Sequence, residues 1–307
     1  MRILSAQKKA SNCVAFSPDG TRLAEAAHGG AVRVWNLASG EAERSFAVKG
    51  LYANQMRLAF SPDGATLAAA VGNVVLLDLA AGTQQRLRTG GTGFCGVAFP
   101  PDGKQLVAAG DSLARWDTAG DEAIDRPLPK MNLPVPRGFT LVGWPACAFS
   151  ADGTRFAVSR RISIVVGDYW RNTEQILIHD PQADAVVARF EWTGHHAHRV
   201  AFSPDSTLVA AACGPVLRVW DAESQALVAE RKLGTLHVMG LAFSPDGRHL
   251  ATVSKDRTTR FWPTGNWGDA KTYEWDVGKL LDVAFSPDGT TAAVSSDKGK
   301  IVLFDVD

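Results

Sequence analysis

Short stretches of alternating apolar and polar residues fill this chain, and each stretch ends at a turn signal. Such alternation is typical of half-buried β-strands. The segment 13–48 holds four of them in succession, through Val14–Phe16, from about Arg22, over Ala31–Asn36 and over Glu41–Val48. The turns between them contain Pro18-Asp19-Gly20, Gly29-Gly30 and Ser39-Gly40, where proline presets its φ angle and glycine accepts a positive one. The segment is therefore predicted to fold as a four-stranded antiparallel meander.

The turn phrase Phe-Ser-Pro-Asp-Gly, intact or altered at one position, recurs seven times. The copies begin at Phe16, Phe60, Phe99, Phe149, Phe202, Phe243 and Phe285. A period of about forty residues is that of a four-stranded propeller blade, which is too small to bury both of its faces without neighbours. We expect one domain over residues 1–307, an all-β, seven-bladed β-propeller of four-stranded antiparallel blades.

The two ends of the chain are out of phase with these repeats. The chain finishes on a third strand, Ile301–Asp305, and begins with one additional strand, Arg2–Ser5, ahead of the first repeat. Pairing the two segments completes a seventh blade and protects two sheet edges that would otherwise be exposed. The sequence therefore predicts a ring that is closed by pairing the N-terminal strand with the C-terminal blade.

A tryptophan motif marks the third strand of several repeats, which read RVWN (33–36), ARWD (114–117), RVWD (218–221) and TRFW (259–262). These motifs resemble the WD-repeat family of propellers along the whole chain. The resemblance implies a rigid, non-catalytic scaffold that binds proteins or peptides. Three blades depart from the pattern, with Leu77, His179 and Phe304 at the tryptophan position. A remnant of the family's buried polar network is expected only at Ser254, Asp256 and Trp262.

Two repeats are longer than the others, and both additions belong to blade four. They lie around 129–143 and 160–172, on the top rim, opposite the rim of the Pro-Asp-Gly turns. The first contains three prolines and is expected to be a stiff exposed loop presenting Lys130, Met131, Arg137 and Phe139. In the second, the alternating Ile162, Ile164 and Val166 predict a protruding hairpin with residues 167–172 at its tip.

The additions carry side chains suited to recognition. Tyrosine, tryptophan and arginine are enriched at binding hot spots, and long loops on a rigid scaffold are where recognition usually occurs. We expect a partner-binding surface with the candidate residues Arg137, Phe139, Arg160, Arg161, Tyr169, Trp170 and Arg171. The alternative is that the two additions pack on each other and only cover the rim.

The residue three positions before each repeat phenylalanine differs among the blades, whereas an alanine always stands directly before it. Because first strands line the axis of a propeller, Arg57, Arg199 and Asp282 are candidates to face the central channel. Structural ion pairing is one role for them, and binding of a ligand anion is the other. The second role leaves open a propeller enzyme of hydrolase or lactonase type, or a small-ligand binder. A stand-alone repeat array derived from a larger protein is a third possibility.

Composition and motifs narrow the function classes. The 32 basic and 32 acidic side chains give no net charge to attract nucleic acid or an anionic membrane. No stretch suits a signal peptide or a transmembrane helix, so we expect a cytoplasmic monomer. The four cysteines lie in different repeats and are expected to be buried free thiols.

Two local patterns imitate cofactor or metal sites. Residues 91–96 match G-x-G-x-x-G, but that motif must open a helix and here it enters a strand. His195, His196 and His198 form a cluster that could be read as a metal site, because alternate residues of a strand share a face, yet no acidic or cysteine partner lies nearby in the sequence. We expect no catalytic residue, no cofactor and no metal, with a protein or peptide as partner.

Overall fold

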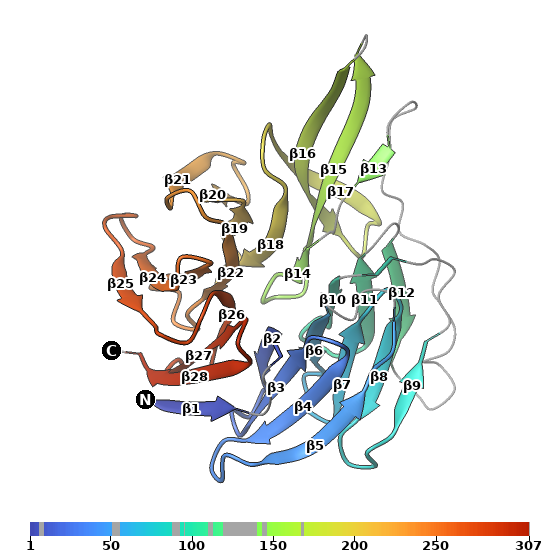
Figure 1. The fold of residues 1–307 in the computed structure, drawn as a ribbon. Coiled ribbons are helices and arrows are strands. Elements are labelled where there is room, and N and C mark those ends of the chain that lie inside the picture. The colour runs from blue at the N-terminus through green and yellow to red at the C-terminus, as the bar shows by residue number, and fades with distance from the viewer. Residues whose placement is uncertain are drawn as a thin grey trace.

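The computed structural model describes residues 1–5, 9–50, 56–87, 93–94, 96–109, 113–118, 140–142, 146–166 and 169–306. Over these residues the chain forms β-strands and turns, grouped in seven antiparallel sheets that surround a common axis (Figure 1). Every first strand contacts the first strands of the two adjacent sheets, so the seven sheets form a complete ring. The predicted all-β, seven-bladed propeller is confirmed. Within the described part of the chain, no helix is long and apolar enough to cross a membrane.

The blades follow one another along the chain. Blades one to four consist of β2 (Ser11–Phe16), β3 (Arg22–Ala27), β4 (Ala31–Asn36) and β5 (Ala42–Ala47); β6 (Arg57–Phe60), β7 (Thr66–Ala70), β8 (Val74–Asp78) and β9 (Gln84–Arg86); β10 (Gly96–Ala98), β11 (Gln105–Ala109) and β12 (Leu113–Asp117); and β14 (Cys147–Phe149), β15 (Phe156–Val166), β16 (Tyr169–Asp180) and β17 (Ala185–Trp192), with β13 (Thr140–Val142) beside β15. Blades five to seven consist of β18 (Ala197–Phe202), β19 (Leu208–Cys213), β20 (Val216–Asp221) and β21 (Leu227–Lys232); β22 (Val238–Phe243), β23 (His249–Ser254), β24 (Thr258–Pro263) and β25 (Lys271–Glu274); and β26 (Leu280–Phe285), β27 (Thr291–Ser296), β28 (Lys300–Asp305) and β1 (Arg2–Ser5).

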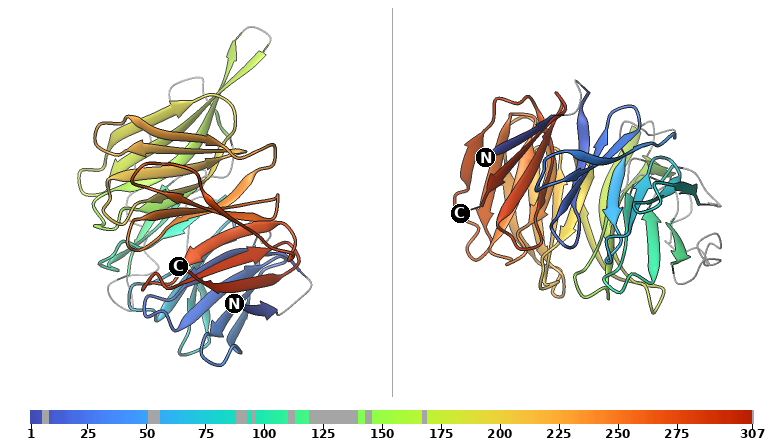
Figure 2. Two further views of the ribbon diagram at one scale, coloured as in Figure 1. Left: turned by 90° about the vertical axis from the view of Figure 1, so that its left-hand side faces the viewer. Right: turned by 90° about the horizontal axis from the view of Figure 1, so that it is seen from below.

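The ring closes within blade seven, as predicted. Strand β1 pairs antiparallel with β28, with Arg2 opposite Leu303 and Ser5 opposite Lys300. The N and C labels lie close together in Figures 1 and 2. Leu4 is buried in this closing blade and packs among residues of blades seven and one, including Ile301 and Val14. The first and last strands therefore form one sheet.

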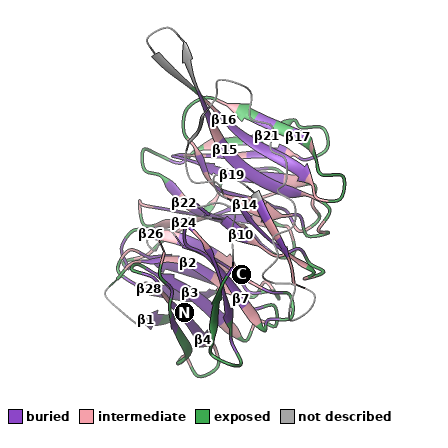
Figure 3. Ribbon diagram, turned by 90° about the vertical axis from the view of Figure 1, so that its right-hand side faces the viewer, coloured by how far each residue is buried: buried purple, intermediate pink, exposed green. Residues whose placement is uncertain are grey.

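The hydrophobic core is divided among the interfaces between blades. Among the described residues, each pair of adjacent blades shares one cluster of buried apolar side chains, and Figure 3 shows the buried residues concentrated along the strands. Apolar residues on the two faces of a blade therefore pack against two different neighbours. Each blade depends on both neighbours for its burial, as expected for a repeat array.

In every blade except the third, which has Pro100 instead, a serine hydroxyl and an aspartate carboxylate hold the repeated turn. In blade one, the Ser17 hydroxyl donates to Asp19 Oδ1 at 2.5 Å, and the backbone N–H of Thr21 donates to the same oxygen at 3.0 Å. Gly20 adopts a φ of 70° and so completes the turn without the strain that a side chain would bring. These two hydrogen bonds lower the pKa of Asp19 to about 2. The aspartates are thus turn residues.

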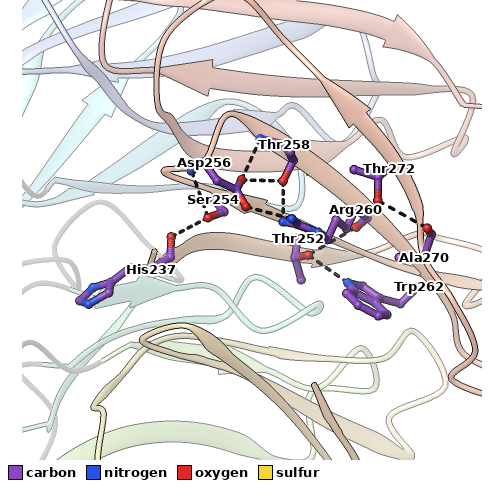
Figure 4. A network of polar contacts seen from close by, with 9 residues as sticks. All are labelled: His237, Thr252, Ser254, Asp256, Thr258, Arg260, Trp262, Ala270 and Thr272. Atoms are coloured by element: carbon purple, nitrogen blue, oxygen red, sulfur yellow. Dashed lines mark hydrogen bonds and ion pairs between the residues drawn. The ribbon is translucent and has the colours of Figure 1, made fainter. Parts of the chain in front are cut away.

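The expected polar remnant in blade six is only partly present (Figure 4). The indole Nε1 of Trp262 donates to Thr252 Oγ1 at 3.0 Å, whereas Ser254 donates to the carbonyl of His237 at 3.1 Å. Asp256 accepts from Arg260 Nη2 at 2.9 Å. The Asp256 backbone N–H donates to Ser254 Oγ at 3.3 Å, so the prediction is wrong only for Trp262, which does not join these two residues. The indole reaches the residue ten positions earlier because Thr252 lies on the neighbouring strand beside it.

Candidate partner-binding surface

A long hairpin distinguishes blade four from the other blades. Its strands β15 and β16 have 11 and 12 residues, whereas the second and third strands of the other blades have five or six. Pairing continues from Phe156 opposite His179 to Val166 opposite Tyr169. In Figures 1 and 2 the hairpin projects beyond the ring. The β-branched residues of β15 favour this extended conformation.

The predicted tip of the hairpin was too long. Tyr169, Trp170 and Arg171 are strand residues that pair with Val166, Val165 and Ile164. Residues 169–172 therefore belong to β16, whereas the sequence assigned them to the tip, because a glycine signals a turn without showing where the next strand begins. The three candidate recognition residues lie at the outer end of a regular hairpin.

A fully buried carboxylate anchors the base of this hairpin. Glu174 of β16 has no exposed side-chain surface, and its Oε1 lies 2.5 Å from Arg161 Nε of β15. Its Oε2 lies 2.8 Å from Nδ1 of His196, which precedes blade five. Removing a carboxylate from water is costly unless charged or hydrogen-bonding partners replace the solvent, and here two such groups do so. The hairpin is thereby tied to the next blade.

The opposite face of the hairpin base carries a second polar contact. Arg160 is buried, and its Nε donates to Gln175 Oε1 at 2.7 Å, while Gln175 in turn donates to Glu191 of β17. Burial lowers the pKa of Arg160 to about 10, which still leaves it charged at neutral pH. Arg160 therefore belongs to the interior of the hairpin base, and Arg161 is the more exposed of the two predicted arginines.

The two additions of blade four meet at one point. Strand β13 pairs with β15, with Thr140 opposite Ser163 and Val142 opposite Arg161. The end of the first addition thus packs along the second, which is the arrangement considered as the alternative to a binding surface. Lys130, Met131, Arg137 and Phe139 lie outside the described residues.

The histidines near the hairpin form contacts of a structural kind. The rings of His195 and His237 lie 5.7 Å apart in an edge arrangement, and His198 Nε2 contacts the carbonyl oxygen of Val238. Burial lowers the pKa of His198, which favours the neutral ring. No group of three or more possible ligands that could hold a metal ion occurs in the described part of the chain. The partner of His196 is Glu174, which the sequence places 22 residues away.

The three channel candidates separate into a pair and a single arginine. Arg199 Nη2 lies 3.1 Å from Asp282 Oδ1, and both side chains are largely buried. Asp282 Oδ2 also accepts the backbone N–H of Val14 at 3.2 Å. Arg57 instead donates to the carbonyl of Met56 at 3.1 Å. Arg199 of blade five is thus linked to blades seven and one.

Gly240 of the intervening blade makes this link possible. A Cβ at Gly240 would lie 2.8 Å from Asp282 Cα and 3.0 Å from its Oδ1, so only glycine leaves room for the carboxylate. Burial and the Asp282 carboxylate together raise the pKa of the Cys13 thiol on β2 far above its ordinary value. A thiol in that state is a poor nucleophile at neutral pH.

This geometry defines a seven-bladed propeller with one elongated hairpin. A family model described as "WD domain, G-beta repeat" matches residues 1–36, 187–221, 230–263 and 271–305. The chain is thus a seven-bladed propeller that contains WD repeats in these four segments. The β-propeller domain of Cps50 (Swd1) from Myceliophteria thermophila superposes with a TM-score of 0.77 over 100% of both chains at 17% sequence identity, which supports the fold.

Several named proteins share parts of the sequence. Apoptotic protease-activating factor 1 of Homo sapiens is 30% identical over 174 residues, which is 54% of this chain and 13% of that protein. The WD repeat-containing protein SL1-17 of Schistosoma mansoni is 37% identical over 100 residues, covering 32% of this chain and 33% of that protein. The target of rapamycin complex subunit LST8-1 of Arabidopsis thaliana is 29% identical over 102 residues, covering 33% of each. The chain thus matches only a minor part of the length of these relatives.

Proposed function

We propose that this protein is a non-catalytic scaffold that binds a protein or peptide on its top rim, with the hairpin β15–β16 as the main contact element. The observation that carries the proposal is the elongated hairpin, which projects from the ring on a base fixed by Glu174, Arg161 and His196. The WD-repeat class supports a scaffold role.

A hairpin held in this way binds at a small entropic cost. A flexible loop must be ordered when its partner arrives, and that ordering opposes binding. Here the strand pairing already fixes the backbone of Tyr169, Trp170 and Arg171. Aromatic and arginine side chains on a pre-ordered backbone are the residue types that dominate binding free energies. The outer half of the hairpin is therefore the part that contacts the partner.

A shortened hairpin tests the proposal directly. Ser163 and Asn172 face each other in the register, so residues 164–171 can be replaced by Asn-Gly, a two-residue turn that suits an antiparallel hairpin. Partners captured from a native lysate are identified by mass spectrometry and their affinities are then measured with purified proteins. We expect the shortened variant, and Trp170→Ala/Arg171→Ala, to bind at least about tenfold more weakly.

The matched control changes a different loop on the same rim. Lys255→Ala/Arg257→Ala removes two cations between β23 and β24 of blade six and leaves the hairpin intact. This variant is expected to retain its partners. Equal binding by the shortened hairpin and the unaltered protein would refute the proposed surface.

A further inference from the structure

A small cavity lies between blades six and seven, on the rim of the Pro-Asp-Gly turns. Its volume is about 190 Å³. The buried rings of Phe261 and Phe304 line it together with the partly buried Tyr273. Ligand sites for small molecules usually start at roughly 300 Å³, so this cavity has the size for one side chain.

The cavity is explained by one residue of the sequence, Phe304, which lines it. Phe304 occupies the position at which blades one, three, five and six carry tryptophan. In blade six that tryptophan, Trp262, is buried against blade five. A phenylalanine fills less volume than an indole at the equivalent place, so space remains between β24 and β28, which belong to neighbouring blades in Figure 1.

The rings around the cavity are arranged edge to face. Phe261 lies 5.7 Å from Tyr273 and 6.1 Å from Phe304, with interplanar angles of 85° and 88°. Trp275 backs the cluster, since its ring lies 4.9 Å from that of Phe304. The faces of such rings carry negative potential and attract cations. A cation is already placed there, because Lys271 Nζ lies 5.2 Å from the centre of the Tyr273 ring.

Charged groups at the cavity mouth add to this preference. Asp269 and Asp305 line the cavity and are exposed, whereas Lys271 is the one lysine or arginine among its described lining residues. The remaining polar lining residue with a titratable side chain is His249. The lining thus has two carboxylates and several aromatic faces, which attract a cation, and one ammonium group, which repels it.

We propose that this cavity binds one basic side chain, preferably arginine, of a peptide partner. A planar guanidinium stacks on an aromatic face and also pairs with carboxylates through its fork of N–H donors, whereas an ammonium group offers only a point charge. The apolar stem of the arginine would contact Phe261 and Phe304, and its head would replace Lys271 over Tyr273. Lysine side chains are flexible, so Lys271 can turn toward solvent.

The site is independent of the hairpin. His249 and Pro263 are paired at the ends of β23 and β24 next to a Pro-Asp-Gly turn, whereas the hairpin grows from the other rim. Failure of one proposal therefore leaves the other untouched.

The test uses N-acetyl-arginine amide and its uncharged isostere N-acetyl-citrulline amide as probes. In an NMR titration of the full chain, the arginine probe is expected to shift the Trp275 indole and Val306 amide signals at millimolar concentration. The citrulline probe should bind at least about tenfold more weakly, because it lacks the charge that the rings and carboxylates recognise. Equal shifts from the two probes, or none from either, would overturn the assignment.

One variant that fills the cavity and two that change its charge show whether the probe binds in the cavity. Phe304→Trp restores the ring of the other blades and fills the cavity, so it should remove the response to the arginine probe while the unfolding midpoint is kept. Asp269→Asn/Asp305→Asn leaves the cavity open and should weaken binding several-fold. Lys271→Met removes the internal competitor and should strengthen it. An undiminished response in Phe304→Trp would place the probe elsewhere and refute the proposal.

Discussion

At the scale of single residues, one serine and one aspartate stabilise six of the seven repeated turns, and Pro100 replaces the serine in blade three. The Ser17 hydroxyl both donates to Asp19 and accepts the backbone N–H of Arg22 at 2.9 Å, and the same pair of contacts recurs at Ser286 with Asp288 and Thr291. The carboxylate is mostly exposed, so its contribution to stability is modest. The main role of the carboxylate is to fix the turn between two strands.

Replacing Ser17 with alanine should raise the pKa of Asp19 from about 2 toward its ordinary value of 3.8, because the largest stabilising hydrogen bond to the carboxylate is lost. NMR titration of the Asp19 carboxyl carbon measures this. In the unaltered protein the folded-state pKa lies below the unfolded one, so the stability from Asp19 is present above about pH 4 and is lost as the pH falls through about 2. A pKa that stays near 2 in Ser17→Ala would contradict the assigned role of the serine.

The side chains that sequence reasoning missed share one property. The missed Glu174 contacts Arg161 across the hairpin and His196 of the next blade, and the missed Thr252 accepts from Trp262 on the neighbouring strand. Local spacing along the chain does not show such contacts, because the register between strands decides them. Counting back from the hairpin turn would have placed Glu174 opposite Arg161, had the turn been located correctly.

At the scale of strands, the repeat phrase predicted nearly every blade. Turn chemistry and alternation locate the hairpins because proline, aspartate and glycine have fixed backbone preferences. Alternation at Ile162, Ile164 and Val166 also predicted that β15 and β16 continue past the rim, although it made the tip of the hairpin too long. Contact between the two additions was one of the alternatives, but the strand β13 that forms it was not predicted, since three residues of a proline-rich addition give no periodic signal.

The inner strands approach each other so closely at Gly240 of β22 that a side chain larger than hydrogen does not fit there. Substitution with alanine would force its Cβ against the backbone of Asp282, so we expect a loss of about 1–3 kcal/mol in the free energy of unfolding. Urea unfolding measures the change. Gly265→Ala is the matched control, because a Cβ there meets no atom within 4 Å and should cost less than about 0.5 kcal/mol. Equal effects of the two changes would show that the contact with Asp282 is unimportant.

At the scale of the whole molecule, the pairing of β1 with β28 closes the ring between residues far apart in the sequence. Strand β1 is the first element of the chain and completes the sheet of the last. The sequence alone predicted this closure, because the ends of the chain are out of phase with the repeats by one strand. It also indicated ion pairing as one role for Arg199 and Asp282, but it did not show that this pair passes Gly240 and connects blades five, seven and one.

Two adjacent residues of β1 test the closure. Leu4 is 3% exposed and faces the core of the closing blade, whereas Ile3 is 43% exposed on the other face. Leu4→Asp buries an unpaired carboxylate and should cost at least about 3 kcal/mol. Ile3→Asp should cost less than about 0.5 kcal/mol. Thermal and urea unfolding compare them, and a Leu4→Asp protein as stable as Ile3→Asp would mean that β1 contributes little to the ring.

Because β1 pairs with β28, the chain could begin and end at a different blade without loss of a sheet. Both chain ends leave the same sheet, with Arg2 opposite Leu303. A short splice between them would turn the polypeptide into a continuous loop of seven sheets, and a new opening at an exposed turn would give a circular permutant with every sheet intact. The opening between β1 and β28 is therefore one of several that this architecture accepts.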